Sequence, residues 1–197
     1  MMSSLSAVIF DFHGVLTESS LPGLVLPELQ DDHEVATALE QLETGRMAMA
    51  DFLAVLPMRP PSRRAFSLAV RRRLVDRTMQ LRASGLRTAL LTNTFRGFSG
   101  IRARAGVDDR TFDVVVESWR YGMRKPAEGL YRLTARQLGV APGQCAYLDD
   151  EAGHVAAATA LGMTALQVVS EQQALDWLAD HFPLAAADQL TPGERRR

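Results

Sequence analysis

The chain has 197 residues, 47% hydrophobic and 23% charged, a balance typical of a globular protein with one domain, or one domain plus an insertion. Its formal net charge of −1 excludes the strong positive field that attracts nucleic acid or an anionic membrane. A single cysteine, Cys145, excludes an internal disulfide, and no apolar run reaches the roughly 18 residues of a membrane span. We therefore expect a cytoplasmic protein.

The first predicted element is a buried strand over residues 7–10, since a short continuous apolar run is typical of a strand in a parallel sheet. Asp11 follows it directly. An Asp at the end of a strand often does no more than bond nearby backbone amides. Ligands of parallel sheets, however, bind outside the carboxyl ends of the strands, so Asp11 is also a candidate nucleophile or metal ligand.

Residues 17–70 are predicted to form a helical insertion. After a loop, a first helix begins at Asp31-Asp32, whose side chains suit an N-cap. A second helix covers residues 49–56. The breaker at residues 58–61, Met-Arg-Pro-Pro, precedes an arginine-rich helix that is predicted to begin at Ser62 and end at Ala83.

Strands and helices alternate in the rest of the chain. Strands are predicted over residues 88–91, 112–116, 145–148 and 164–169, and helices over residues 100–105, 126–138, 154–161 and 172–180. Such alternation indicates a mostly parallel sheet between two layers of helices. We therefore predict an α/β three-layer sandwich made of residues 1–16 and 71–197, with residues 17–70 as a small helical cap.

Polar side chains gather at the predicted strand ends and in one loop between them: Asp11, Thr92-Asn93, Lys125 and Asp149-Asp150. In a parallel sheet all of them face one crevice. Carboxylates suit Mg²⁺, whereas a hydroxyl and an ammonium group suit phosphate oxygens. Phosphoryl transfer needs an in-line nucleophile and neutralisation of the phosphate charge, which this set of residue types supplies.

Four segments resemble, in order, the motifs of the haloacid dehalogenase (HAD) superfamily with a helical cap: Asp11–Val15, Leu90–Thr94, Gly122–Pro126 and Tyr147–Asp150. Residues 112–126 and 138–162 are most similar to the phosphatase-like N-terminal domain of soluble epoxide hydrolases. The resemblance implies a Rossmann-like core and a Mg²⁺-dependent phosphatase of a small phosphorylated metabolite. Neither nucleic acid nor a membrane is expected as a partner, and the oligomeric state stays open.

The resemblance also implies roles for single residues. Asp11 would attack phosphorus and form an aspartyl-phosphate, and Lys125 would pair with both the nucleophile and the phosphate. Thr92 and the backbone amide of Asn93 would bind phosphate oxygens.

Mg²⁺ would be held by Asp11, by the backbone carbonyl of His13 and by Asp150. Asp149 would complete and orient this metal cluster.

Two histidines depart from the family pattern. His13 stands where family phosphatases carry the Asp that protonates the leaving group and then activates water. An imidazole, with an ordinary pKa of about 6.5, can still move protons near neutral pH, so His13 remains the candidate acid/base. His154 stands where the most similar relatives carry Asn, and we expect it to contact substrate.

Two alternatives remain open. One is a metal-independent 2-haloacid dehalogenase-like hydrolase, in which the same Asp attacks carbon; such relatives lack paired acids like Asp149-Asp150. The other is a catalytically impaired HAD scaffold that binds a phosphorylated ligand or partner, an alternative that His13 favours.

Overall fold

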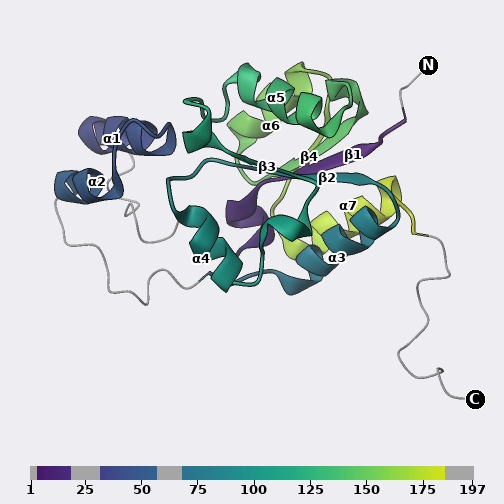
Figure 1. The fold of residues 1–197 in the computed structure, drawn as a ribbon. Coiled ribbons are helices and arrows are strands. Elements are labelled where there is room, and N and C mark those ends of the chain that lie inside the picture. Colours follow the sequence, from purple (N-terminus) through teal and green to yellow (C-terminus); the bar gives the residue numbers. More distant parts are fainter. Residues whose placement is uncertain (1–3, 19–31, 57–67, 185–197) are drawn as a thin grey trace, which may run out of the picture.

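A computed structural model describes residues 4–18, 32–56 and 68–184 (Figure 1). Its centre is a five-stranded sheet of order β3-β2-β1-β4-β5. Every strand pair is parallel. The strands are β1 (Ala7–Phe10), β2 (Arg87–Thr92), β3 (Val114–Glu117), β4 (Cys145–Asp149) and β5 (Thr164–Gln167). The predicted α/β sandwich is therefore confirmed.

The apolar run of β1 occupies the middle of the sheet. All four of its side chains are fully buried, because Val8 and Phe10 pack into the core on one face while Ala7 and Ile9 pack on the other. Burial on both faces explains why the strand is a continuous apolar run rather than an alternating one.

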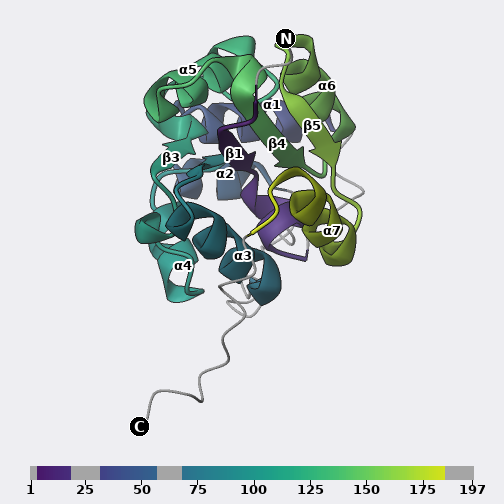
Figure 2. The same ribbon diagram turned by 90° about the vertical axis from the view of Figure 1, so that its right-hand side faces the viewer.

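Helices cover both faces of the sheet (Figure 2). On one face lie α3 (Arg72–Ala83), α4 (Phe98–Arg104) and α7 (Glu171–His181). On the other face lie α5 (Glu128–Leu138) and α6 (Ala152–Ala160). None of the helices in the described segments is long and apolar enough to cross a membrane.

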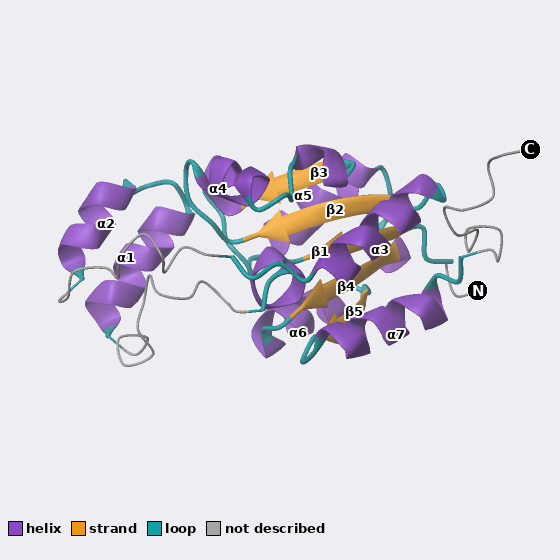
Figure 3. Cartoon of the chain, turned by 90° about the horizontal axis from the view of Figure 1, so that it is seen from below, coloured by secondary structure: helices purple, strands orange, loops and turns teal. Residues whose placement is uncertain are grey.

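Two further helices, α1 (His33–Glu43) and α2 (Met49–Val55), stand beyond the carboxyl ends of the strands (Figure 3). Asp32 is the N-cap residue of α1, as predicted. Its carboxylate accepts hydrogen bonds from the amides of Glu34 at 2.9 Å and Val35 at 3.2 Å. Thr17 and Val70, the first and last residues of the predicted insertion, pair with each other in an isolated antiparallel bridge.

The predicted helix from Ser62 to Ala83 was wrong at its start. Residues 68–71 are not helical, and α3 begins at Arg72. Val70 is instead paired with Thr17, and the guanidinium of Arg71 donates to the carbonyls of Gly14 at 2.6 Å and Val15 at 3.2 Å. These long-range bonds outweigh the local helical pattern. Ser62 itself, the breaker at 58–61 and Asp31 lie outside the described residues.

The helix predicted over residues 126–138 also begins later than expected. Pro126 precedes α5, whose N-cap is Ala127, and it follows Lys125 through a cis peptide bond. The end was predicted correctly, because Gly139 occupies the C-cap with a φ of 72°.

Candidate active site

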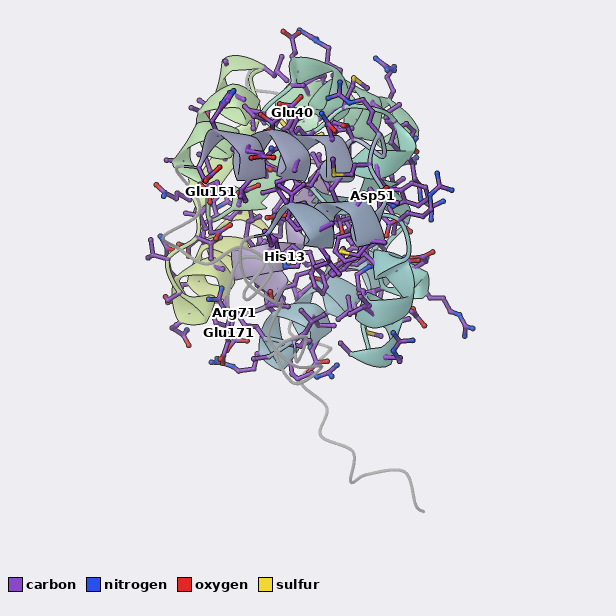
Figure 4. All side chains as sticks on the ribbon, turned by 90° about the vertical axis from the view of Figure 1, so that its left-hand side faces the viewer. His13, Glu40, Asp51, Arg71, Glu151 and Glu171 are labelled. Atoms are coloured by element: carbon purple, nitrogen blue, oxygen red, sulfur yellow. The ribbon has the colours of Figure 1, made fainter. Side chains whose placement is uncertain are left out.

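The candidate site begins at the carboxyl end of β1. The amide of Asp11 still belongs to the sheet, donating to the carbonyl of Leu148 at 2.9 Å, while its side chain meets Lys125. Residues 12–16 then form a tight turn, closed by a hydrogen bond from the amide of Thr17 to the carbonyl of Phe12 at 3.0 Å, in which φ and ψ of His13 and Gly14 are not helical. Figure 4 views this edge from the side of α1 and α2, with His13 near the centre.

Lys125 joins two of the predicted carboxylates. Its Nζ lies 2.8 Å from Asp11 Oδ1 and 2.6 Å from Asp149 Oδ2, and its side chain is 1% exposed. Burial by itself lowers the pKa of Lys125, but the charges of Asp11 and Asp149 outweigh it and hold the pKa above its usual range. The ammonium group is therefore permanently charged between the two acids.

Asp150 completes an acidic cluster with Asp11 and Asp149, in which one oxygen of each lies within 4.8 Å of the others. Burial raises the pKa of Asp11 to about 8; Lys125 opposes this rise, and Asp149 and Asp150 add to it. Burial and the charge of Asp149 raise the pKa of Asp150 to about 6. Three carboxylates thus lie close together, and the single positive charge of Lys125 does not neutralise all of them. This arrangement favours binding of a cation.

Gly14 allows this cluster to form. Its φ is 71°, and a Cβ at this position would lie 2.0 Å from Asp150 Oδ2. The carboxylate of Asp150 therefore rests directly on the backbone of the turn that follows Asp11, so only glycine fits here.

Asp149 is oriented from several sides. Its Oδ1 accepts from the amide of Glu151 at 2.9 Å, Tyr147 Oη donates to its Oδ2, and Nδ1 of His154 lies 3.1 Å from Oδ1 and 3.2 Å from Oδ2. Burial alone raises the pKa of Asp149, but Lys125 and His154 outweigh it, so the pKa lies below its usual range. Asp149 is therefore an ionised anchor for its neighbours.

The sequence interpretation missed Tyr147. The available signal was the period of a strand, because Tyr147 and Asp149 are two residues apart on β4 and so project to the same side. The structure also gives His154 a position that the sequence did not predict, with its Nδ1 against Asp149.

Asn93 holds the loop that carries Lys125. Its side chain accepts a hydrogen bond from the amide of Lys125 at 2.8 Å and donates one to the carbonyl of Lys125 at 3.1 Å. Thr92, the last residue of β2, is fully buried beside it. The side chain of Asn93 thus has a positioning task that the sequence did not predict, while its amide remains the group expected to meet phosphate.

His13 lies in an aromatic setting. Its ring centroid is 5.2 Å from that of Phe12 and 5.1 Å from that of Phe98, and the residue is 6% exposed. Neither ring nitrogen has a hydrogen-bond partner among the described residues. Burial, together with the charge of Lys125, lowers the pKa of His13 to about 3. The ring is therefore neutral near pH 7, and both of its nitrogens are buried.

Comparison with known proteins agrees with this geometry. The profile of haloacid dehalogenase-like hydrolases matches residues 5–162. A phosphatase of Mycobacterium tuberculosis is 29% identical over 211 residues, covering 88% of this chain and 91% of that protein.

Two longer proteins match over part of their length. Bifunctional epoxide hydrolase 2 of Sus scrofa is 32% identical over 106 residues, which cover 52% of this chain and 19% of that protein. Acyl-CoA dehydrogenase family member 10 of Mus musculus is 38% identical over 89 residues, which cover 45% of this chain and 8% of that protein. The matched part is thus less than a fifth of either relative.

Solved structures share the fold at low identity. A HAD family enzyme of Bacteroides thetaiotaomicron superposes with a TM-score of 0.70 at 16% identity, covering 88% of this chain and 99% of that one. The same enzyme in complex with magnesium and inorganic phosphate gives a TM-score of 0.61 at 16% identity, with coverage of 83% and 93%. L-2-haloacid dehalogenase of Xanthobacter autotrophicus gives 0.60 at 19%, with coverage of 93% and 86%.

Proposed function

Because this chain belongs to the haloacid dehalogenase-like hydrolases, we propose that it is a Mg²⁺-dependent phosphatase of a small phosphorylated metabolite. The observation that carries this proposal is the meeting of Asp11, Asp149 and Asp150 within 4.8 Å of one another. The phosphatase of Mycobacterium tuberculosis, similar over most of its length, supports the same activity.

The residues at the site fit a magnesium ion. Mg²⁺ prefers oxygen ligands, and the cluster offers carboxylate oxygens whose charge exceeds that of Lys125 alone. We propose Asp11, the backbone carbonyl of His13 and Asp150 as ligands of the ion. Asp149 completes the acidic cluster and orients Lys125 through their ion pair. When bound, the ion would neutralise negative charge on the phosphate and on the attacking carboxylate.

In the first step of the proposed reaction, an oxygen of Asp11 attacks phosphorus. The bond between phosphorus and the ester oxygen breaks, an aspartyl-phosphate forms, and the departing alkoxide takes its proton from water, because His13 is neutral at pH 7. Lys125 forms an ion pair with Asp11 before the reaction. As Asp11 attacks, the ammonium group stabilises the negative charge of the phosphate. The hydroxyl of Thr92 and the amide of Asn93 bind phosphate oxygens and orient them for in-line attack.

In the second step, water attacks the phosphorus of the aspartyl-phosphate and restores Asp11. His13 takes the proton of this water at a ring nitrogen; the imidazole is neutral at pH 7, but a pKa lowered to about 3 makes it a weak base, so we expect this step to be slow. We also propose that His154 contacts the substrate, while its Nδ1 lies against Asp149.

We propose that residues 17–70 form a cap over this site and that residues 1–16 and 71–197 form the core. The position of α1 and α2 beyond the strand ends supports this division (Figure 3). The bridge between Thr17 and Val70 supports its boundary.

A test of the function is release of phosphate from 4-nitrophenyl phosphate and from a panel of phosphate esters, with Mg²⁺ and with EDTA. We expect turnover only with Mg²⁺ and its loss in Asp11→Asn. Absence of turnover across the panel would refute the phosphatase and favour the impaired scaffold, for which the replacement of Asp by His13 is the supporting observation. Chloride release from a 2-haloacid in EDTA would favour the dehalogenase instead.

A further inference from the structure

Glu43, the last residue of α1, is buried although it carries a carboxylate. Its side chain is 4% exposed, whereas that of Glu40, one turn earlier, is 55% exposed and pairs with Arg46 at 2.8 Å. Acidic side chains are rarely buried to this degree unless they are paired and hydrogen-bonded. The burial of Glu43 therefore calls for a partner of its carboxylate.

One oxygen of the Glu43 carboxylate, Oε2, is ion-paired without a well-formed hydrogen bond. Oε2 lies 3.0 Å from Nε of Arg124, yet both atoms are buried and neither has a hydrogen-bond partner in the described part of the chain. A carboxylate can accept several hydrogen bonds, so this one keeps unused acceptor capacity.

The surroundings of Glu43 place it at the candidate active site. Arg124 directly precedes Lys125 in the chain. Burial raises the pKa of Glu43, and the charges acting against that rise are those of Arg124, Lys125 and His154. Lys125 and His154 both contact Asp149, and the ion pair with Arg124 places Glu43 beside the loop that carries Lys125.

The end of α1 is held firmly in this position. Ser118 Oγ donates to the carbonyl of Glu43 at 2.6 Å and accepts from the amide of Thr94 at 2.9 Å, which ties the helix to the loops after β2 and β3. A Cβ on Gly45 would lie 2.5 Å from the carbonyl oxygen of Trp119, so the turn after α1 packs directly on that loop. The carboxylate of Glu43 is thus preorganised for a ligand.

We propose that Glu43 recognises the leaving group of the substrate by accepting a hydrogen bond from a hydroxyl or ammonium group on it. This inference rests on the proposed phosphatase function and narrows its substrates to phosphate monoesters of small polyols or amino alcohols. A substrate without such a donor leaves the buried carboxylate unsatisfied and is bound less well, which is an effective basis of discrimination.

The test measures binding in an Asp11→Asn background, which needs no turnover. Calorimetry gives the Kd of glycerol 1-phosphate, of phosphoethanolamine and of methyl phosphate, which has no donor on its leaving group. We expect both donor-bearing ligands to bind at least about tenfold more tightly than methyl phosphate. Adding Glu43→Met is expected to abolish this preference, whereas Glu40→Gln on the same helix leaves it unchanged.

Glu43→Gln separates the two donors. The amide oxygen of Gln still accepts a hydrogen bond from a hydroxyl, so the preference for glycerol 1-phosphate over methyl phosphate falls only slightly. The preference for phosphoethanolamine falls more, because its ammonium group no longer faces a negative charge. Equal weakening of all three ligands in Glu43→Met would show a merely structural role and overturn the inference, as would no preference before the change. Hydrolysis of 4-nitrophenyl phosphate by the native chain reports separately on the proposed function.

Discussion

Replacing His13 by Asp tests what the imidazole supplies to the reaction. The pKa of His13 is lowered to about 3 by burial and by Lys125. That value lies about four units below neutral pH, so roughly one imidazole in 10⁴ is protonated at pH 7. The native site therefore offers almost no acid for a departing alkoxide, whereas a positioned acid is worth about 10²–10⁴-fold.

We expect His13→Asp to raise kcat for an alkyl phosphate by about 10²-fold and to change kcat for 4-nitrophenyl phosphate much less, because nitrophenolate leaves without a proton. The measurement is steady-state release of phosphate at pH 7 with Mg²⁺. The smaller side chain loses contacts with Phe12 and Phe98, so the variant should also unfold more easily, by about 1–3 kcal/mol.

His13→Asn is the matched control, since it has the size of Asp without a transferable proton. If the Asn and Asp variants gain equally, the benefit comes from space rather than from acid catalysis. If both substrates gain equally in His13→Asp, leaving-group protonation does not limit the native enzyme, and the reasoning from the buried, neutral imidazole is refuted.

Three further predictions concern the charges of the site. Lys125→Met leaves the buried carboxylates without their ammonium partner, so we expect loss of turnover and about 3–5 kcal/mol of stability in EDTA, measured by urea unfolding, with part of the stability restored by Mg²⁺. Gly14→Ala pushes a methyl group onto Asp150, so calorimetry should show at least tenfold weaker Mg²⁺ binding, whereas Gly97→Ala, also at a positive φ but with open space around it, leaves the Mg²⁺ affinity unchanged. Without metal, the pKa of Asp11 is raised from 3.8 to about 8, so the folded state binds more protons than the unfolded state in this window and stability should fall as pH rises from about 4 to about 8. Mg²⁺ should flatten this slope, and an equal slope with and without Mg²⁺ would contradict the placement of Asp11 in the metal cluster.

The sequence predicted best where local pattern and tertiary structure agree. β1 is found at the predicted residues, because burial on both faces demands the continuous apolar run that made it visible. The gathering of Asp11, Lys125 and Asp149 also follows from the sequence, because parallel strands bring their carboxyl ends to one edge.

The sequence failed where distant segments decide the structure. Residues 68–71 follow a helical pattern, yet Val70 pairs with Thr17, which no local signal reveals. Glu43 reads as a solvated helix residue, and only the docking of α1 on Ser118 shows that its carboxylate is buried. The surroundings of His13 were equally hidden, because Phe98 lies far from it in the chain.

The pairing of Thr17 with Val70 has a consequence for how such a protein diversifies. Beside this pair, the amide of Glu18 donates to the carbonyl of Ala69 at 2.9 Å, so backbone hydrogen bonds hold the two ends of residues 17–70 side by side. Because the two ends of the inserted segment meet there, a change in the length of the segment need not alter the spacing of its two ends. Under the proposed function, exchange of the segment between these two ends would replace Glu43, and with it the proposed recognition of the leaving group, while Asp11, Lys125 and Asp150 stay in place.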